Sequence, residues 1–224
     1  MMKSWSGQTV KSIRRRAILA APALLVRPAR AVTVPETGTL TFRMMRHGDA
    51  IGTHRLTFAR DDGTLRVHIA VDAVVTLLSI PIVRYRHQAV ETWRDGRLVG
   101  LAAETNKNGE QEWAKARLTA AGLEVSGSQT RPYLAPSDAI PTSYWDKQML
   151  DGKMISLEDG VLLAPKVAAM PAETIMLASG RRIPADHYAL SGAFAVDLWY
   201  DRADTWAGMA MTVADGSEVR YERL

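Results

Sequence analysis

The sequence contains no cysteine among its 224 residues. Disulfide bonds, thiol nucleophiles and thiolate metal sites are therefore excluded, and the core must be stabilised by packing alone. Motifs of common hydrolases are also missing, because there is no Gly-x-Ser-x-Gly elbow, no Ser-x-x-Lys and no His-Glu-x-x-His. No glycine-rich loop for a phosphate is present. The sequence thus predicts no catalytic residue, no cofactor and no dedicated metal site.

Acidic residues are absent from the first 31 positions, which hold seven of the 28 basic residues. Residues 32–224 therefore carry 21 basic and 24 acidic residues, a net charge of −3, although the whole chain has a formal charge of +4. The basic character belongs to the N-terminal segment, and the remainder has no bulk attraction for nucleic acid or anionic lipid. We expect no nucleic-acid partner.

The N-terminal segment has the parts of an export signal. Basic residues precede an apolar run over residues 17–26, and Ala29-Arg30-Ala31 places small residues at the usual cleavage spacing. Ten apolar residues are too few to span a bilayer as a stable helix. The sequence predicts that residues 1–31 are a signal peptide read by the export machinery. Residues 32–224 are then a single β domain in the periplasm, without an integral membrane span.

The type of signal follows from a short run of residues. Arg15-Arg16-Ala17-Ile18-Leu19 resembles the twin-arginine motif, in which two arginines precede a spacer and apolar residues. Arg14 departs from that motif, because Ser or Thr is usual there. Twin-arginine export is the prediction, and an ordinary secretory leader is the alternative.

After Pro35 the chain reads as a succession of strands separated by turn residues. Residues 64–75 alternate between apolar and polar side chains, and Asp-Gly turns recur along the chain. The pattern predicts an all-β, mainly antiparallel domain in which about 12 strands form one large curved or barrel-like sheet. Residues 129–141 contain three prolines and are expected to be a long surface loop. Residues 142–150 predict a short helix.

The chain's densest set of polar and aromatic groups lies in residues 83–101, which predict two strands joined at Asp95-Gly96. Pro81 interrupts the apolar run before them and suggests a bulge or a strand edge. Side chains alternate along a strand. One face of the first strand therefore carries Tyr85, His87, Ala89, Glu91 and Trp93. The other face carries Arg84, Arg86, Gln88, Val90 and Thr92.

Short motifs along the chain occur in an order that resembles one family. They are Gly52, Arg84-Tyr85-Arg86-His87, Glu91-Thr92-Trp93, Asp95-Gly96, Asn106 with Asn108-Gly109, Thr142-Ser143-Tyr144-Trp145, Leu198-Trp199-Tyr200-Asp201 and Asp215-Gly216-Ser217. Over nearly all of residues 32–224 the chain resembles exported proteobacterial proteins of unknown function of the DUF6134 type. That family is distantly similar to curved-sheet envelope proteins such as the half-barrel carriers of lipoproteins. The resemblance implies an antiparallel sheet around an apolar interior and no catalytic residue.

Six side chains are candidates for ligand binding in such an interior: Tyr85, His87, Glu91, Trp93, Trp145 and Trp199. His87 and Glu91 would be polar groups that fix the head group of a ligand in an apolar groove. In the structural alternative, Glu91 satisfies a backbone turn or an arginine, and the tryptophans are core or cover packing.

Three functions agree with these observations. The favoured one is a periplasmic, non-catalytic binding module that holds an apolar or lipid-like ligand in the curved sheet. The second is a structural or interaction protein of the envelope whose sheet is filled by its own side chains. The third is an enzyme that pairs a histidine, His87 or His187, with a carboxylate. A zinc site built from His68, His87 or His187 lacks ligand spacing in the sequence.

The export prediction can be tested with two changes to the N-terminal segment. A chain that begins at Val32 should fold with unchanged stability, because residues 32–224 have their own β pattern. Replacing Arg15 and Arg16 by Lys should block export and leave the fold intact, since the twin-arginine machinery reads the two arginines. Periplasmic fractionation measures the second result. Unimpaired export of the double variant would leave ordinary secretion, and failure of the shortened chain to fold would remove the signal-peptide interpretation.

Overall fold

The computed structural model describes residues 34–77 and 80–224. The predicted export signal, residues 1–31, lies outside the described residues. Within them the chain consists of β-strands and one 3-10 helix, and the strands of the main sheet run antiparallel, so the predicted fold class is confirmed. No helix in these two ranges is long and apolar enough to cross a membrane.

One large sheet contains thirteen strands, and all its neighbouring strands are antiparallel. The strands are β1 (Thr39–Arg46), β2 (Asp49–Asp61), β3 (Thr64–Leu77), β4 (Ile80–Arg94), β5 (Arg97–Lys107), β6 (Glu110–Thr119), β7 (Gly122–Gly127), β8 (Thr130–Ala135), β12 (Lys166–Met176), β13 (Arg182–Ser191), β14 (Val196–Tyr200), β15 (Trp206–Thr212) and β16 (Glu218–Arg223).

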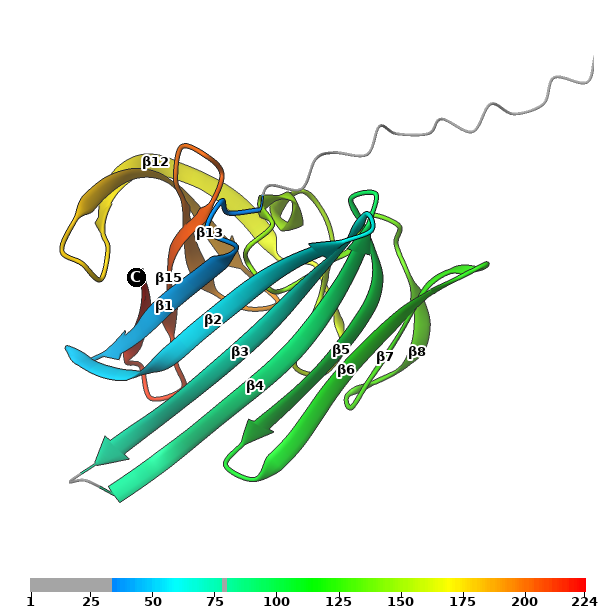
Figure 1. Ribbon diagram of the computed structural model, residues 1–224. Coiled ribbons are helices and arrows are strands. Elements are labelled where there is room, and N and C mark those ends of the chain that lie inside the picture. The colour runs from blue at the N-terminus through cyan, green and yellow to red at the C-terminus, as the bar shows by residue number, and fades with distance from the viewer. Residues whose placement is uncertain (1–33, 78–79) are drawn as a thin grey trace, which may run out of the picture.

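The order of strands in the sheet follows a simple path. From β1 the chain runs strand by strand to β8 at one edge, crosses to β12 at the other edge, and returns strand by strand to β16, which pairs with β1. Figure 1 shows the sheet curving so that β5 to β8 and β12 to β15 lie on opposite sides of the molecule. Since β8 and β12 do not pair with each other, the sheet is open rather than closed into a barrel.

The hairpin turns follow from local sequence. Asp95 and Gly96 have φ angles of 50° and 69°, and Arg94 pairs with Arg97, which is the geometry of a two-residue type I′ turn. The register of β3 and β4 shifts at Pro81, so the bulge predicted there is confirmed. These turns fix the register, and register decides which side chains face the interior.

Residues 130–135 differ from the sequence expectation, because they form β8 and not part of a loop. Pro132 is tolerated because β8 is an edge strand and because the register with β7 shifts beside it. A proline there costs no hydrogen bond to a second neighbour strand.

Residues 136–165, which we call the crossing segment, connect β8 to β12. They contain β9 (Ile140–Pro141), the 3-10 helix η1 (Lys147–Asp151), β10 (Met154–Ile155) and β11 (Leu162–Leu163), and the three short strands form a separate small sheet. The ring of Trp145 lies 5.2 Å from that of Phe58 in β2 and 5.6 Å from that of Trp93 in β4. On the other side, the Tyr200 hydroxyl of β14 donates to the Tyr144 carbonyl at 2.8 Å. The sheet therefore curves around this segment, which covers its apolar face.

The short helix expected over residues 142–150 is present only as η1. Tyr144 has a φ angle of 65°, in the left-handed region, so a right-handed helix cannot pass through it. Asp146 caps η1, and its carboxylate accepts a hydrogen bond from the Gln148 backbone N–H at 3.0 Å. The Tyr144 ring packs 5.5 Å from that of Trp206, so tertiary contacts override the local helix preference.

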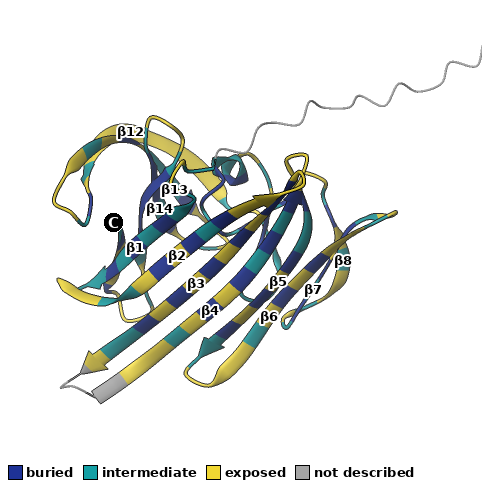
Figure 2. Ribbon diagram, in the orientation of Figure 1, coloured by how far each residue is buried: buried dark blue, intermediate teal, exposed yellow. Residues whose placement is uncertain are grey.

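Alternation along β4 places its two faces as the sequence predicts. His87, Ala89, Glu91 and Trp93 are buried and Tyr85 is half-buried, whereas Arg84, Arg86 and Gln88 are exposed. Figure 2 shows the same alternation of buried and exposed residues along β3 and β4. The buried side chains join those of the crossing segment in one continuous core.

Gly127 tests how closely the crossing segment approaches the sheet. A Cβ atom at this position would lie 1.9 Å from the Asp159 backbone oxygen, so Gly127→Ala must displace the segment. We expect the variant to lose about 1–3 kcal/mol of unfolding free energy, as overpacked cores do. Gly100→Ala is the matched control, because its Cβ would meet Thr92 at an ordinary 3.6 Å. Urea unfolding measures both, and equal stability of the two variants would refute the close approach.

Candidate functional site

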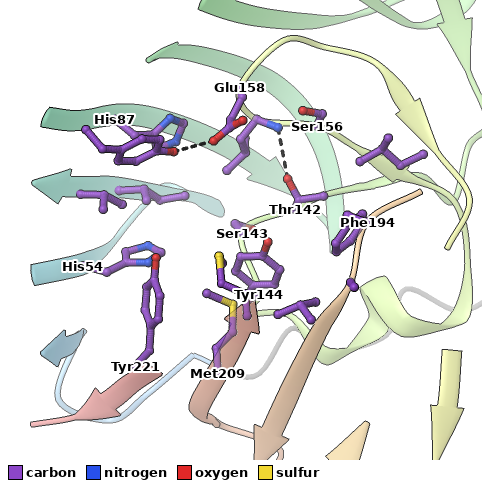
Figure 3. A pocket seen from close by; sticks show the side chains of 18 of the residues that line it. His54, His87, Thr142, Ser143, Tyr144, Ser156, Glu158, Phe194, Met209 and Tyr221 are labelled. Carbon is purple, nitrogen blue, oxygen red and sulfur yellow. Dashed lines mark hydrogen bonds between the residues drawn. The ribbon is translucent and has the colours of Figure 1, made fainter. Parts of the chain in front are cut away.

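A cavity of about 370 Å³ lies between the sheet and the crossing segment. Its wall includes Val71 of β3, Met209 of β15 and Leu157 of the crossing segment, and apolar atoms make up most of it. Met211 and Phe194 are half-buried and Thr212 is exposed, so this side of the wall reaches the protein surface. Figure 3 shows the side chains that surround the cavity.

Two histidines from neighbouring parts of the sheet face this cavity. His54 of β2 pairs in register with Val71 of β3, and Val71 pairs with His87 of β4, so the three share one row and one face. Figure 3 shows both rings on the same side of the cavity, across from Phe194. His54 is 5% exposed and His87 is 4% exposed, so the protein has largely removed both rings from water.

The hydrogen bonds of these rings are incomplete. His87 Nδ1 lies 2.8 Å from Thr105 Oγ1, and His87 Nε2 has no partner among the described residues. Neither ring nitrogen of His54 has a hydrogen-bond partner among the described residues. Buried polar atoms are nearly always hydrogen-bonded, so three unpartnered ring nitrogens on one wall are unusual.

Both histidines are neutral at neutral pH. Burial lowers the pKa of His54 to about 3, and the nearby His87 lowers it further. Burial lowers the pKa of His87 to about 4, with Glu158 raising it and Lys107 lowering it. A neutral imidazole offers one N–H donor and one nitrogen acceptor. His54 and His87 therefore contribute polar but uncharged side chains to the cavity wall.

The charged groups near the cavity are already paired. Glu158, which lines the wall, accepts a hydrogen bond from the Tyr85 hydroxyl at 2.8 Å and lies 2.6 Å from Lys107 Nζ. Lys107 Nζ also lies 2.9 Å from Glu112 Oε2. No lysine or arginine of residues 34–77 and 80–224 lines the cavity itself. The wall thus has no cation available for an anionic ligand.

Tyrosines complete the polar wall. Tyr144 of the crossing segment and Tyr221 of β16 both line the cavity, and burial raises the pKa of each hydroxyl. Both hydroxyls therefore stay protonated and can donate hydrogen bonds. The positive φ angle of Tyr144 is what places its ring here, beside Trp206.

Of the six candidates from the sequence, only Tyr85 and His87 line this cavity. Glu91, Trp93 and Trp145 form a separate buried cluster, in which Glu91 Oε2 accepts hydrogen bonds from both indole N–H groups at 2.9 Å. Glu91 is fully buried, and burial raises its pKa to about 7 against hydrogen bonds from Ser143, Trp145 and Trp93 that lower it. The cluster joins the sheet to the crossing segment.

Trp199, the sixth candidate, faces the opposite side of the sheet from the crossing segment. It packs with Ala185, Ala207 and Ala210 in a second, smaller core. Its indole donates to Glu173 Oε1 at 2.7 Å, and its ring stacks on His187 at 4.8 Å. It is therefore not part of the cavity that contains Tyr85 and His87.

His187 is the histidine that lies beside carboxylates. Its Nε2 is 2.7 Å from Asp197 Oδ1 and its Nδ1 is 3.2 Å from Glu173 Oε1. Each ring nitrogen of His187 thus faces a carboxylate, and His187 does not line the cavity. No group of three or more metal-binding side chains occurs in the described ranges.

The sequence interpretation missed His54, Tyr144, Glu158 and Tyr221 as members of the wall. For His54 a signal existed, because alternation with Leu56 and Phe58 places it on the core face of β2. For Tyr144 and Glu158 there was none, since both lie in irregular parts of the crossing segment.

A family match covers most of the chain. The model for the family described as "Domain of unknown function (DUF6134)" matches residues 42–224. The chain belongs to this family. No curated protein matches it significantly. The matched region of the DUF6134 chain contains the row of His54, Val71 and His87 and the whole crossing segment.

Glu91 generates a prediction about pH. Its folded pKa of about 7 lies above the ordinary value of 4.5, so its contribution to stability is complete below pH 4.5 and is lost as pH rises through 7. The loss amounts to about 3 kcal/mol. Glu91→Gln lacks the ionisation, and relative to the wild type it should gain stability over this pH range. Repulsion from Asp146 also raises the pKa of Glu91, so it is part of the loss that Glu91→Gln removes.

Urea unfolding at several pH values measures the difference. Glu104→Gln, on the exposed face of β5, is the control and should change with pH as the wild type does. If Glu91→Gln and the wild type show the same pH dependence, the buried carboxylate does not titrate as stated.

Proposed function

We propose that this DUF6134 chain is a non-catalytic binding protein that holds a small apolar molecule in the cavity between the sheet and the crossing segment, and that it works in the periplasm after export. The observation that carries the proposal is the cavity itself, which has apolar walls and unpartnered histidine nitrogens within a core that is otherwise closely packed. Binding sites for small molecules commonly combine apolar walls with a few polar groups.

The volume limits what can bind. At roughly 30 Å³ for an atom-sized unit such as water, the 370 Å³ cavity has room for about a dozen non-hydrogen atoms. A complete two-chain phospholipid is far larger than this. The ligand is therefore a compact apolar molecule, or one end of a lipid-like molecule whose remainder extends past Met211 and Phe194.

The other two functions find less support. Trp145, Met149 and Ile155 of the crossing segment fill much of the interior, as a self-filled structural protein would require. The cavity beside them favours binding over that alternative. The enzyme alternative requires His87 or His187 beside a carboxylate in a cleft. His87 Nδ1 contacts Thr105, and His187, which lies beside carboxylates, is not in the cavity.

Filling the cavity tests the proposal. Val71→Phe adds bulk between His54 and His87, where there is space, so the protein should stay folded but bind apolar probes at least about tenfold more weakly. Naphthalene and 1-decanol serve as probes. A saturating probe should raise the melting temperature of the wild type, because a ligand that binds only the folded state stabilises it. Val71→Phe should lose this increase.

Val90→Phe is the matched control, since Val90 lies on the other face of β4 and the same bulk there leaves the cavity unchanged. It should respond to probes as the wild type does. The proposal is wrong if neither probe stabilises the wild type and organic extraction of the exported protein releases no small molecule.

A further inference from the structure

We infer that the cavity selects uncharged ligands that carry a hydroxyl or carbonyl group, and that His54 and His87 are the residues that recognise this group. The inference rests on the proposed function, because it concerns the same cavity. It adds the chemical class of the ligand and the two residues that set it.

The first argument is the number of unused hydrogen-bonding atoms. Three ring nitrogens of His54 and His87 have no partner among the described residues, although both side chains are more than nine-tenths buried. A hydroxyl can donate to one ring nitrogen and accept from another, and a carbonyl can accept from a ring N–H. A pure hydrocarbon can do neither. A ligand with such a group would therefore satisfy atoms that a hydrocarbon leaves unpaired.

The second argument is geometric. His54 and His87 lie in one row, two strands apart, so about 10 Å separates their backbones at the usual strand spacing. Val71 lies between them, and both rings border the same side of the cavity (Figure 3). Thr105 Oγ1 holds Nδ1 of His87, and Nε2 is buried without a partner among the described residues. The two rings thus form one polar strip on an apolar wall.

The third argument is the lack of a charge to offset a charged ligand. The cavity wall has no lysine or arginine within residues 34–77 and 80–224, and the two histidines are neutral. The Glu158 carboxylate of the wall is already neutralised by Lys107, which also contacts Glu112. Burying a carboxylate, phosphate or ammonium group without a partner of opposite charge is strongly unfavourable. Fatty acids and phosphorylated lipids are therefore excluded as ligands that bring their charged head group into the cavity.

A matched set of naphthalene derivatives tests the inference at neutral pH. Naphthalene has no polar group, 2-naphthol is its uncharged alcohol, and 2-naphthoate and 2-naphthylmethylammonium carry opposite charges. Affinities come from calorimetry on the full chain, with the decane, 1-decanol and decanoate series as a second scaffold. We expect 2-naphthol to bind about three- to tenfold more tightly than naphthalene, the range of one or two added hydrogen bonds. Both charged probes should bind at least about tenfold more weakly than naphthalene.

Substitutions separate recognition from shape. His54→Leu keeps a side chain of similar size and removes both ring nitrogens, so the affinity ratio of 2-naphthol to naphthalene should fall toward one while naphthalene binding persists. His54→Gln retains hydrogen-bonding atoms and should keep part of the ratio. His87→Leu gives an independent reading of the same ratio if His54→Leu does not fold. A merely structural role would change both affinities together and leave the ratio unaltered.

The outcomes distinguish the inference about ligand class from the proposed binding function. If naphthalene or decane binds and the alcohols bind no more tightly, or a charged probe binds best, the inference is overturned and the proposed function stands. The inference is also overturned if the ratio survives in both His54→Leu and His87→Leu. If no probe on either scaffold binds, the proposed function fails and the inference fails with it. Preference for the alcohols, lost in the histidine variants, supports both.

Discussion

The docking of the crossing segment onto the curved sheet is the contact on which the rest of the structure depends. An open sheet of thirteen strands has a broad apolar face, and that face needs a cover to be stable in water. Residues 136–165 supply the cover, with Trp145 between Phe58 and Trp93 on one side and Tyr144 beside Trp206 on the other. Glu91 fixes this arrangement, because one carboxylate oxygen accepts both indole N–H groups.

The cavity follows from where that cover ends. Around Glu91 the segment fills the interior, and further along the same face of β4, at His87 and Tyr85, the packing leaves about 370 Å³. Glu91 lies outside the cavity wall, and its Oε2 accepts hydrogen bonds from both the sheet and the segment. Its Oε1, like three nitrogens of His54 and His87, is unpartnered among the described residues. The position of the two histidines on the cavity wall is therefore the reason to assign ligand recognition to them and a structural role to Glu91.

Sequence reasoning succeeded where structure is set locally. Alternation in residues 83–101 and the Asp95-Gly96 turn were enough to place Tyr85, His87, Glu91 and Trp93 on one inner face. Alternation also set Trp199 on the face opposite to Leu198 and Tyr200, which is why it lies away from the cavity. Grouping it with the other candidates gave its aromatic character more weight than its position along the strand.

What could not be predicted depends on contacts between distant residues. Trp145 meets Glu91 across 54 positions of sequence, and Glu158 meets Tyr85 across 73. The left-handed backbone of Tyr144 and the strand at Pro132 contradict local preferences, and both are explained by their neighbours in space. The path of an irregular segment is fixed by the surface it covers, so its contribution to the cavity wall is visible only in the folded structure.

The most direct measurement of the central claim reads the histidine rings themselves. Nitrogen NMR of the protein, recorded while 2-naphthol is added, reports each imidazole separately. The account predicts that the ring-nitrogen resonances of His54 and His87 move together and saturate. The resonances of His68 and His187, which both lie on the face of the sheet away from the cavity, should stay in place. Resonances of His54 and His87 that do not move while the probe binds elsewhere, or movement confined to His187, would contradict it.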